Sequence, residues 1–338
     1  MLRGARKRAW PAALVLLASS TAACDLSTSQ DGAAATTAPA TSETPTSAPT
    51  TSRASEGSPT PSVRTTSGTA ATTVPSPPDS APSTTHPSTT AATPARPPSE
   101  ISPFTASDTL GDRLAAAEAA LADPDTPPGD FRRWAWVHQQ AYRDLVTNPD
   151  WQDAVRNRIP SDLRDAFDLN VRAGTHLREL TTPQPGVPDW RIVPAPPVEE
   201  LRTYYAETEA EFGVPWQVLA AIHLVESRFG RIRGDSHAGA QGPMQFLPST
   251  WAAYGEGDID DPSDAIMAAG RYLAAHGAPD DLRSALYAYN HSDLYVAAIL
   301  AHAEAIERYD HYLAVYHQWR VYYRTVDGDV VLEEGYGT

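Results

Sequence analysis

Apolar side chains recur at helical spacing through most of the chain after residue 100. Residues three and four positions apart share one face of an α-helix, so this spacing predicts amphipathic helices. In the first part of this region it predicts three helices, whose apolar positions run over 110–121, 131–145 and 163–177. Residues 181–197 are rich in proline, which predicts an irregular hinge after the third helix.

The same spacing continues in the second part of the chain. It predicts further helices over 197–212, 214–229, 262–275, 281–289 and 292–309, and another that starts at Pro248. In the segment 320–332, β-forming residues flank Asp327-Gly328, a pair typical of a tight β-hairpin turn. The pattern therefore predicts a mainly α fold with a small C-terminal β-hairpin.

One of these helices carries a carboxylate in an apolar setting. Glu226 lies among the apolar positions of 214–229, and Gly230 is the expected end of the helix, so Glu226 falls in its last turn. Burial and the negative helix end both disfavour an ionised carboxylate, which predicts a raised pKa and a proton held near neutrality. The alternative is a solvated glutamate paired with Arg228 or Arg231.

A glycine-rich loop follows this helix closely. Residues 236–246 read SHAGAQGPMQF, and the glycines allow the backbone to approach a ligand. The next helix begins near Pro248, with Ser249 or Thr250 as the expected cap. A buried acid beside a close-fitting polar loop is an arrangement suited to general acid catalysis on a sugar.

At these residues the chain resembles the lytic murein transglycosylases, whose catalytic domain is lysozyme-like and of the goose type. The resemblance is strongest to the membrane-bound lytic transglycosylase B branch and covers roughly 197–310. It rests on Glu226-Ser227, GAQGPMQFLPST at 239–250, DPSDAI at 261–266 and AYNHSDLYV at 288–296.

The resemblance implies cleavage of the β-1,4 bond between N-acetylmuramic acid and N-acetylglucosamine, with a 1,6-anhydromuramic acid product. It implies that Glu226 is first the acid and then the base. The residues that it places around the substrate are Ser227, Ser236, Met244, Gln245, Phe246, Tyr289, Asn290 and His291.

The number of carboxylates bears on the mechanism. Most glycosidases use two, whereas this region offers one well-placed acid, Glu226. Asp264 and Asp293 are expected to serve helix starts, although the sequence leaves a second catalytic carboxylate open. A hydrolytic muramidase and a non-catalytic peptidoglycan-binding scaffold are therefore the alternatives.

The N-terminal part predicts export and anchoring. Residues 1–23 have a basic start and a short apolar core, as in a secretory signal peptide. They end in Ser-Thr-Ala-Ala before Cys24, the only cysteine, which resembles a bacterial lipobox and predicts a lipid-anchored protein that faces the cell wall. The alternative is a plain signal peptide with an incidental cysteine. Residues 24–100 are rich in Thr, Ser, Pro and Ala, which predicts a disordered tether.

These features divide the chain into five segments. They are a signal peptide (1–23), a tether (24–100), a helical subdomain (101–195), a catalytic domain (196–318) and a hairpin with its tail (319–338). A net charge of −16 argues against nucleic acid as a partner. No cofactor motif or metal set is evident, and the expected partners are peptidoglycan, the membrane through Cys24, and cell-wall synthesis or division proteins.

Overall fold

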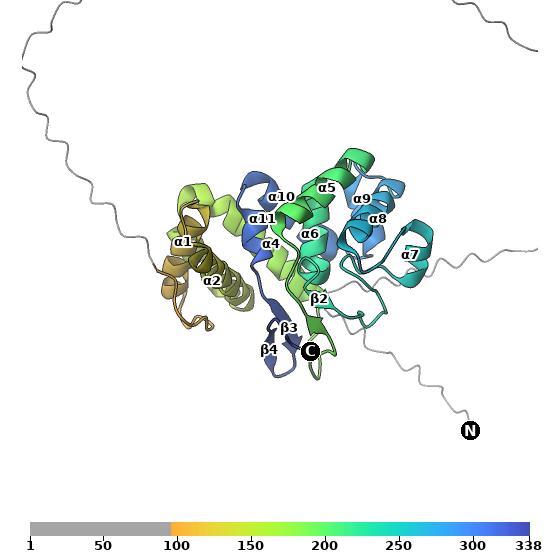
Figure 1. Ribbon diagram of the computed structural model, residues 1–338. Coiled ribbons are helices and arrows are strands. Elements are labelled where there is room, and N and C mark those ends of the chain that lie inside the picture. Colours follow the sequence, from red (N-terminus) through yellow and green to blue (C-terminus); the bar gives the residue numbers. More distant parts are fainter. Residues whose placement is uncertain (1–95) are drawn as a thin grey trace, which may run out of the picture. The chain divides into compact units, whose positions relative to one another are not determined.

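The computed structural model describes residues 96–338, which form one compact, mainly helical unit with two small antiparallel strand pairs (Figure 1). This confirms the predicted fold class. The predicted signal peptide, Cys24 and nearly all of the tether lie outside the described residues. Within the described part of the chain, no helix is long and apolar enough to cross a membrane.

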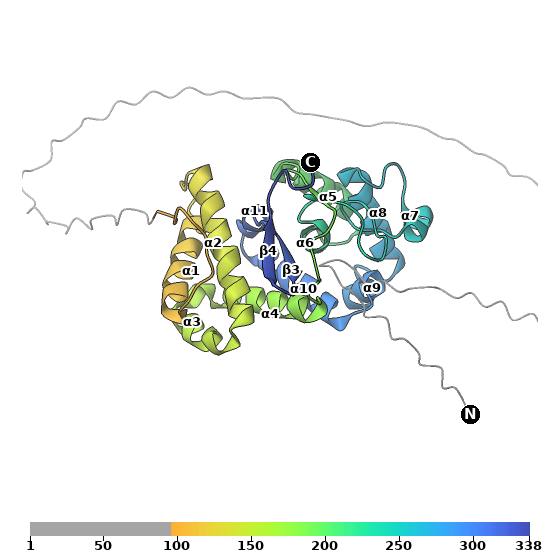
Figure 2. The same cartoon turned by 90° about the horizontal axis from the view of Figure 1, so that it is seen from below.

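The first four helices form one end of this unit. They are α1 (Ser107–Ala122), α2 (Pro128–Thr147), α3 (Gln152–Arg158) and α4 (Arg164–Leu180). Helix α1 packs against α2 and α3 (Figure 2), whereas α4 packs along α10 and shares its core. Leu169 and Leu177 of α4 are buried with the residues of α6 and α10. The predicted helical subdomain therefore contributes directly to the core of the predicted catalytic domain.

The remaining helices follow α4 in the chain. They are α5 (Val198–Phe212), α6 (Trp216–Ser227), α7 (Pro248–Tyr254), α8 (Pro262–Ala275), α9 (Leu282–Tyr289), α10 (Asp293–Arg308) and α11 (Tyr312–His317). Helix α6 contacts α5, α8, α10 and α11 (Figure 1), and every residue from Val218 to Ser227 is buried. A helix that is apolar nearly all round belongs in the interior, so its sequence accounts for its position.

Two strand pairs complete the fold. The predicted hairpin is confirmed as β3 (Val321–Thr325) paired antiparallel with β4 (Gly328–Leu332). The proline-rich hinge also contains a strand, β1 (Arg191–Ile192), which pairs antiparallel with β2 (Ile232–Arg233). The expectation of a wholly irregular hinge was wrong at these positions, where the backbone of the segment after α6 supplies a partner.

The helix starts differ in how they are capped. Asp261 begins α8 and accepts hydrogen bonds from the amides of Ser263 and Asp264, as its position before Pro262 suggests. No side chain caps α7, so the expected role of Ser249 or Thr250 was wrong. Pro248 stands in the first turn of α7, where its missing N–H costs no helical hydrogen bond.

Candidate active site

The candidate site is built at the C-terminal end of α6. The helix ends at Ser227, three residues before the predicted stop at Gly230. Arg228 and Phe229 follow in the left-handed conformation, with φ values of 54° and 60°. Their amides bond back to the carbonyls of Leu224 and His223, which closes the helix end. Glu226 therefore lies in the last turn, as predicted, and is fully buried.

The Glu226 carboxyl has a single hydrogen-bond partner. The hydroxyl of Tyr295, on α10, donates to Oε1 of Glu226 at 2.7 Å, whereas Oε2 is buried without a partner among the described residues. Burial raises the pKa of Glu226 to about 8, against an opposing effect of the Tyr295 hydrogen bond. The carboxyl is therefore protonated at neutral pH, which is the state that a general acid requires.

The alternative of a solvated, ion-paired glutamate is wrong. Arg231 pairs with Glu334, and Arg228 donates to the carbonyl of Leu224 at 2.7 Å. Neither arginine pairs with Glu226, so the carboxyl keeps its proton without competition from a nearby cation.

The glycine-rich loop is a tight turn held by its own backbone. Gln241 and Phe246 exchange two backbone hydrogen bonds of 2.9 Å, and the residues between them form the turn. Gln245 has a positive φ of 51°, and its side-chain amide donates to the carbonyl of Gly242 at 2.9 Å. Gly242 itself has a φ of 74°, and a Cβ there would lie 2.0 Å from the carbonyl oxygen of Ile259. This glycine thus permits close approach of the chain to itself.

Two hydrogen bonds join this loop to the ends of α6 and α9, and the hydroxyl of Ser236 makes two more within it. Ser227, at the end of α6, donates to the carbonyl of Pro243, and Tyr289, at the end of α9, donates to the carbonyl of Met244 at 2.7 Å. The hydroxyl of Ser236 accepts from the amides of Ala238 and Ala240. The side chains of Ser227 and Ser236 are thus engaged in holding the loop, and Met244 is fully buried.

These contacts bring together the ends of α6 and α9, the loop and α10. In this region Glu226 Oε2, Gln245 Oε1 and Asn290 Nδ2 are all buried without a partner among the described residues. Unpaired buried polar atoms are rare in folded proteins and call for an explanation. An acid, an acceptor and a donor in this state are the groups that an amide- and hydroxyl-bearing ligand would satisfy.

Aromatic side chains form the wall beside these atoms. Phe246 packs against Tyr289 at a ring-centroid distance of 5.7 Å, and the rings of Tyr289 and Tyr295 are nearly parallel. A cavity is lined by Gln245, Phe246 and Tyr289 together with their neighbours. His291 stands apart from this group, since it is exposed and packs edge-on against Tyr287. The structure thus connects Ser227, Met244, Gln245, Phe246 and Tyr289 through the loop, whereas Ser236 bonds only within the loop. Glu226 is not among the residues that line the cavity.

Tyr295 is the residue of the site to which sequence reasoning gave no role. It lies 69 positions after Glu226, and its spacing on α10 with Val296 and Ile299 is that of a core aromatic. Its hydroxyl is the only feature that could have suggested a polar partner, because a buried tyrosine hydroxyl normally finds one.

The histidine one turn before Glu226, His223, is a core residue. His223 is fully buried and its Nδ1 is hydrogen-bonded to the hydroxyl of Tyr205 at 2.8 Å. Burial lowers the pKa of His223 to about 3, so its ring is neutral. Among residues 96–338 there is no group of three or more His, Cys, Asp or Glu side chains that could hold a metal ion.

Comparison with known proteins bears on the same part of the chain. No curated protein and no solved structure matches this chain. The family model described as the Transglycosylase SLT domain matches residues 203–310, from within α5 to just beyond α10. This range contains Glu226, the glycine-rich loop, Tyr289 and Tyr295. Residues 203–310 therefore form a transglycosylase SLT domain, which implies lytic transglycosylase activity on the glycan strands of peptidoglycan.

Proposed function

We propose that the protein cleaves the β-1,4 bond between N-acetylmuramic acid and N-acetylglucosamine, and that Glu226 is its single acid and base. The product end is a 1,6-anhydromuramic acid. The observation that carries this proposal is the buried Glu226 carboxyl, whose pKa is raised to about 8 by burial and which lies at the end of a central helix of the SLT domain.

The reaction needs one proton to leave Glu226 and one to return. In the first step the carboxyl gives its proton to the glycosidic oxygen, and the bond between that oxygen and C1 of muramic acid breaks. The positive charge that develops at C1 is stabilised by the carbonyl oxygen of the sugar's own N-acetyl group. In the second step the carboxylate takes the proton of the C6 hydroxyl, whose oxygen bonds to C1.

The second step uses the geometry of the substrate. The C6 hydroxyl belongs to the same sugar ring as C1, so its effective concentration far exceeds that of a dilute nucleophile. The Tyr295 hydroxyl helps in the interval between the two steps, because a donor at 2.7 Å stabilises the ionised carboxylate. Gln245 and Asn290 are proposed to hold the N-acetyl and hydroxyl groups through their unpaired side-chain atoms.

The surroundings of Glu226 favour one carboxylate over two. Its pKa responds to burial and to Tyr295, and no other carboxylate is among the causes. Asp264 accepts a hydrogen bond from the amide of Asp258 at 2.8 Å, and Asp293 lies exposed in the first turn of α10. Both acids are thus explained by local structure, which weakens the case for a hydrolytic muramidase.

Product analysis with Glu226→Gln tests the proposal. Mass spectrometry of the fragments released from isolated cell walls should show anhydro ends, which lack one water relative to hydrolysed ends. Loss of general acid–base catalysis should lower the rate by at least about 10²–10⁴-fold in Glu226→Gln, with binding to cell walls retained. Asp264→Asn and Asp293→Asn are the matched controls and should stay active.

Three outcomes would contradict this account. Reducing ends in the product, or an Asp264→Asn or Asp293→Asn variant as inactive as Glu226→Gln, would favour a two-carboxylate hydrolase. A wild-type protein that binds cell walls but releases nothing would favour the non-catalytic scaffold.

The location of the enzyme is a separate part of the proposal. We propose that residues 1–23 direct export and that Cys24 carries a lipid anchor, so that the tether of residues 24–100 places the SLT domain at the cell wall. The basic start, the apolar core and the small residues before Cys24 support this. Proteins of cell-wall synthesis or division are the expected partners at that place.

A further inference from the structure

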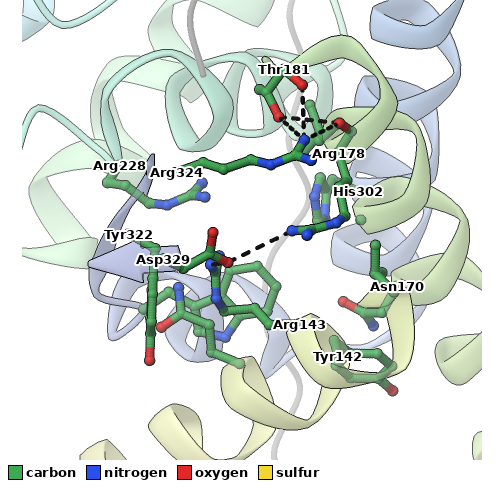
Figure 3. A pocket seen from close by; sticks show the side chains of 15 residues that line it. Tyr142, Arg143, Asn170, Arg178, Thr181, Arg228, His302, Tyr322, Arg324 and Asp329 are labelled. Atoms are coloured by element: carbon green, nitrogen blue, oxygen red, sulfur yellow. Dashed lines mark hydrogen bonds and ion pairs between the residues drawn. The ribbon is translucent and has the colours of Figure 1, made fainter. Parts of the chain in front are cut away.

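A second pocket lies apart from the site around Glu226. It is formed where α2, α4, α10 and the β3–β4 hairpin meet the residues that follow α6 (Figure 3). Its volume is about 90 Å³. Four cationic side chains and one acidic side chain line it. They are Arg143, Arg178, Arg228, Arg324 and Asp329. This excess of positive charge stands out in a chain of net charge −16.

Arg228 is the most deeply placed of the four arginines. Its side chain and backbone together are 7 % exposed, and no carboxylate lies within ion-pair distance of it among the described residues. Burial and the neighbouring Arg143 lower the pKa of Arg228 to about 10, which leaves the guanidinium charged at neutral pH. Burying a cation without a counter-ion costs folding free energy. Arg228 also holds a left-handed backbone conformation, which is unfavourable for a residue other than glycine.

The one acid of the pocket is already engaged by two other arginines. Asp329 forms an ion pair with Arg143 and lies 3.7 Å from Arg178. Arg324 donates through Nη1 to the carbonyls of Arg178 and Thr181. These neutral acceptors satisfy hydrogen bonds but leave its charge uncompensated. Asp329 therefore cannot balance the whole cluster, and Arg228 receives nothing from it.

Two further nitrogen atoms of residues that line the pocket lack hydrogen-bond partners among the described residues. Nε1 of Trp319 and Nδ1 of His302 are buried and make no hydrogen bond among the described residues. The indole Nε1 can only donate. Burial, followed by the nearby Arg228, lowers the pKa of His302 to about 3, so this ring is neutral and can present one N–H. The pocket thus offers cations and neutral donors, and the acceptors that would match them are anionic oxygens.

We propose that this pocket binds a small anion with two or more oxygen acceptors, a carboxylate or a phosphate, in direct contact with Arg228. A guanidinium presents its donors in a planar fork that fits such groups. A volume of about 90 Å³ holds one anion of this size. The pocket walls come from both ends of the chain's described part, so the bound anion joins α2, α4 and the hairpin to the residues after α6.

The test uses the full-length protein with inorganic phosphate and with acetate as probes. Thermal unfolding and titration calorimetry are recorded at constant ionic strength, with sodium chloride as the reference salt. A specific anion should raise Tm with its concentration, since it binds the folded state alone. The probe that binds more tightly shows whether the pocket prefers a phosphate or a carboxylate.

Three variants give the proposal its sharpest test. Arg228→Gln should weaken the binding of the preferred anion by about tenfold or more, and Asp329→Asn should tighten it several-fold because the internal carboxylate no longer competes. Arg172→Gln is the matched control on α4, where an exposed arginine pairs with Glu304, and should leave binding unchanged.

The proposal is overturned if neither probe shifts Tm beyond the chloride reference, or if Arg228→Gln and Arg172→Gln bind alike. Should Arg228→Gln fail to fold, Asp329→Asn decides: tighter binding supports the site, and unchanged or weaker binding overturns it. None of these measurements depends on lytic activity, so the outcome is independent of the function proposed for Glu226.

Discussion

Replacing Glu226 with glutamine should stabilise the folded protein, and by an amount that grows with pH. The carboxyl has an ordinary pKa near 4.5 when unfolded and a pKa of about 8 when buried. Between these two values the folded state binds more protons than the unfolded state, so the free energy of unfolding of the wild type falls as pH rises. Glutamine cannot ionise and is free of this loss.

The size of the effect follows from the two pKa values. Each unit of difference corresponds to about 1.4 kcal/mol, so the full penalty above pH 8 approaches about 5 kcal/mol. At pH 7 it is about 3 kcal/mol, and near pH 4 it vanishes.

Denaturant unfolding at pH 5, 6, 7 and 8 measures the difference. The gap between Glu226→Gln and the wild type should widen steadily over this range, whatever constant offset the amide brings. Glu307→Gln, at an exposed position of α10, serves as the control for loss of one surface charge. A gap that stays constant to within about 0.5 kcal/mol from pH 5 to pH 8 would refute the raised pKa and, with it, the basis for a protonated acid.

Three further predictions concern other parts of the protein. Tyr295→Phe should lower kcat and move the alkaline limb of the pH–rate profile to higher pH, because its hydrogen bond opposes the rise in the pKa of Glu226; an unshifted limb would contradict this role. Gly242→Ala should destabilise the protein by several kcal/mol, since its Cβ would meet a backbone carbonyl at 2.0 Å. The control Gly239→Ala meets nothing within 4 Å and should cost only about 1–2 kcal/mol of backbone strain. Equal losses of stability in denaturant unfolding would disprove the close approach at Gly242. Cys24→Ala should move the protein from the membrane fraction to the soluble fraction, and unchanged partitioning without lipid labelling of the wild type would refute the anchor.

The sequence predicted the elements whose signals are local. Helical spacing located α2, α4, α6, α8 and α10, and Asp327-Gly328 marked the turn between β3 and β4. It missed α3, α11, β1 and β2, since each is short and packs against a partner distant in the chain. The end of α6 was placed at Gly230 because glycine favours the left-handed conformation. Gly230 does adopt it, with a φ of 77°, but Arg228 and Phe229 before it are already left-handed, so the helix ends earlier. Tertiary packing overrides the local preference there.

The candidate site was predicted in the same uneven way. The apolar pattern of α6 gave the burial of Glu226 and the direction of its pKa change. The partner of its carboxyl could not be predicted, because the bond to Tyr295 spans 69 positions and depends on how α10 crosses α6. The loop glycines were expected to let the backbone approach a ligand. The structure gives Gly242 another role, because this glycine lets the loop pack against the backbone of Ile259.

The packing of α4 along α10 has a consequence for how this protein can be divided. The SLT match begins at residue 203, yet Leu169 and Leu177 of α4 share one core with α6 and α10. A fragment limited to 203–310 would present that apolar surface to water, and such surfaces drive self-association. The smallest piece that expresses as a soluble monomer should therefore begin before α4. In this chain the unit of folding is larger than the unit of homology.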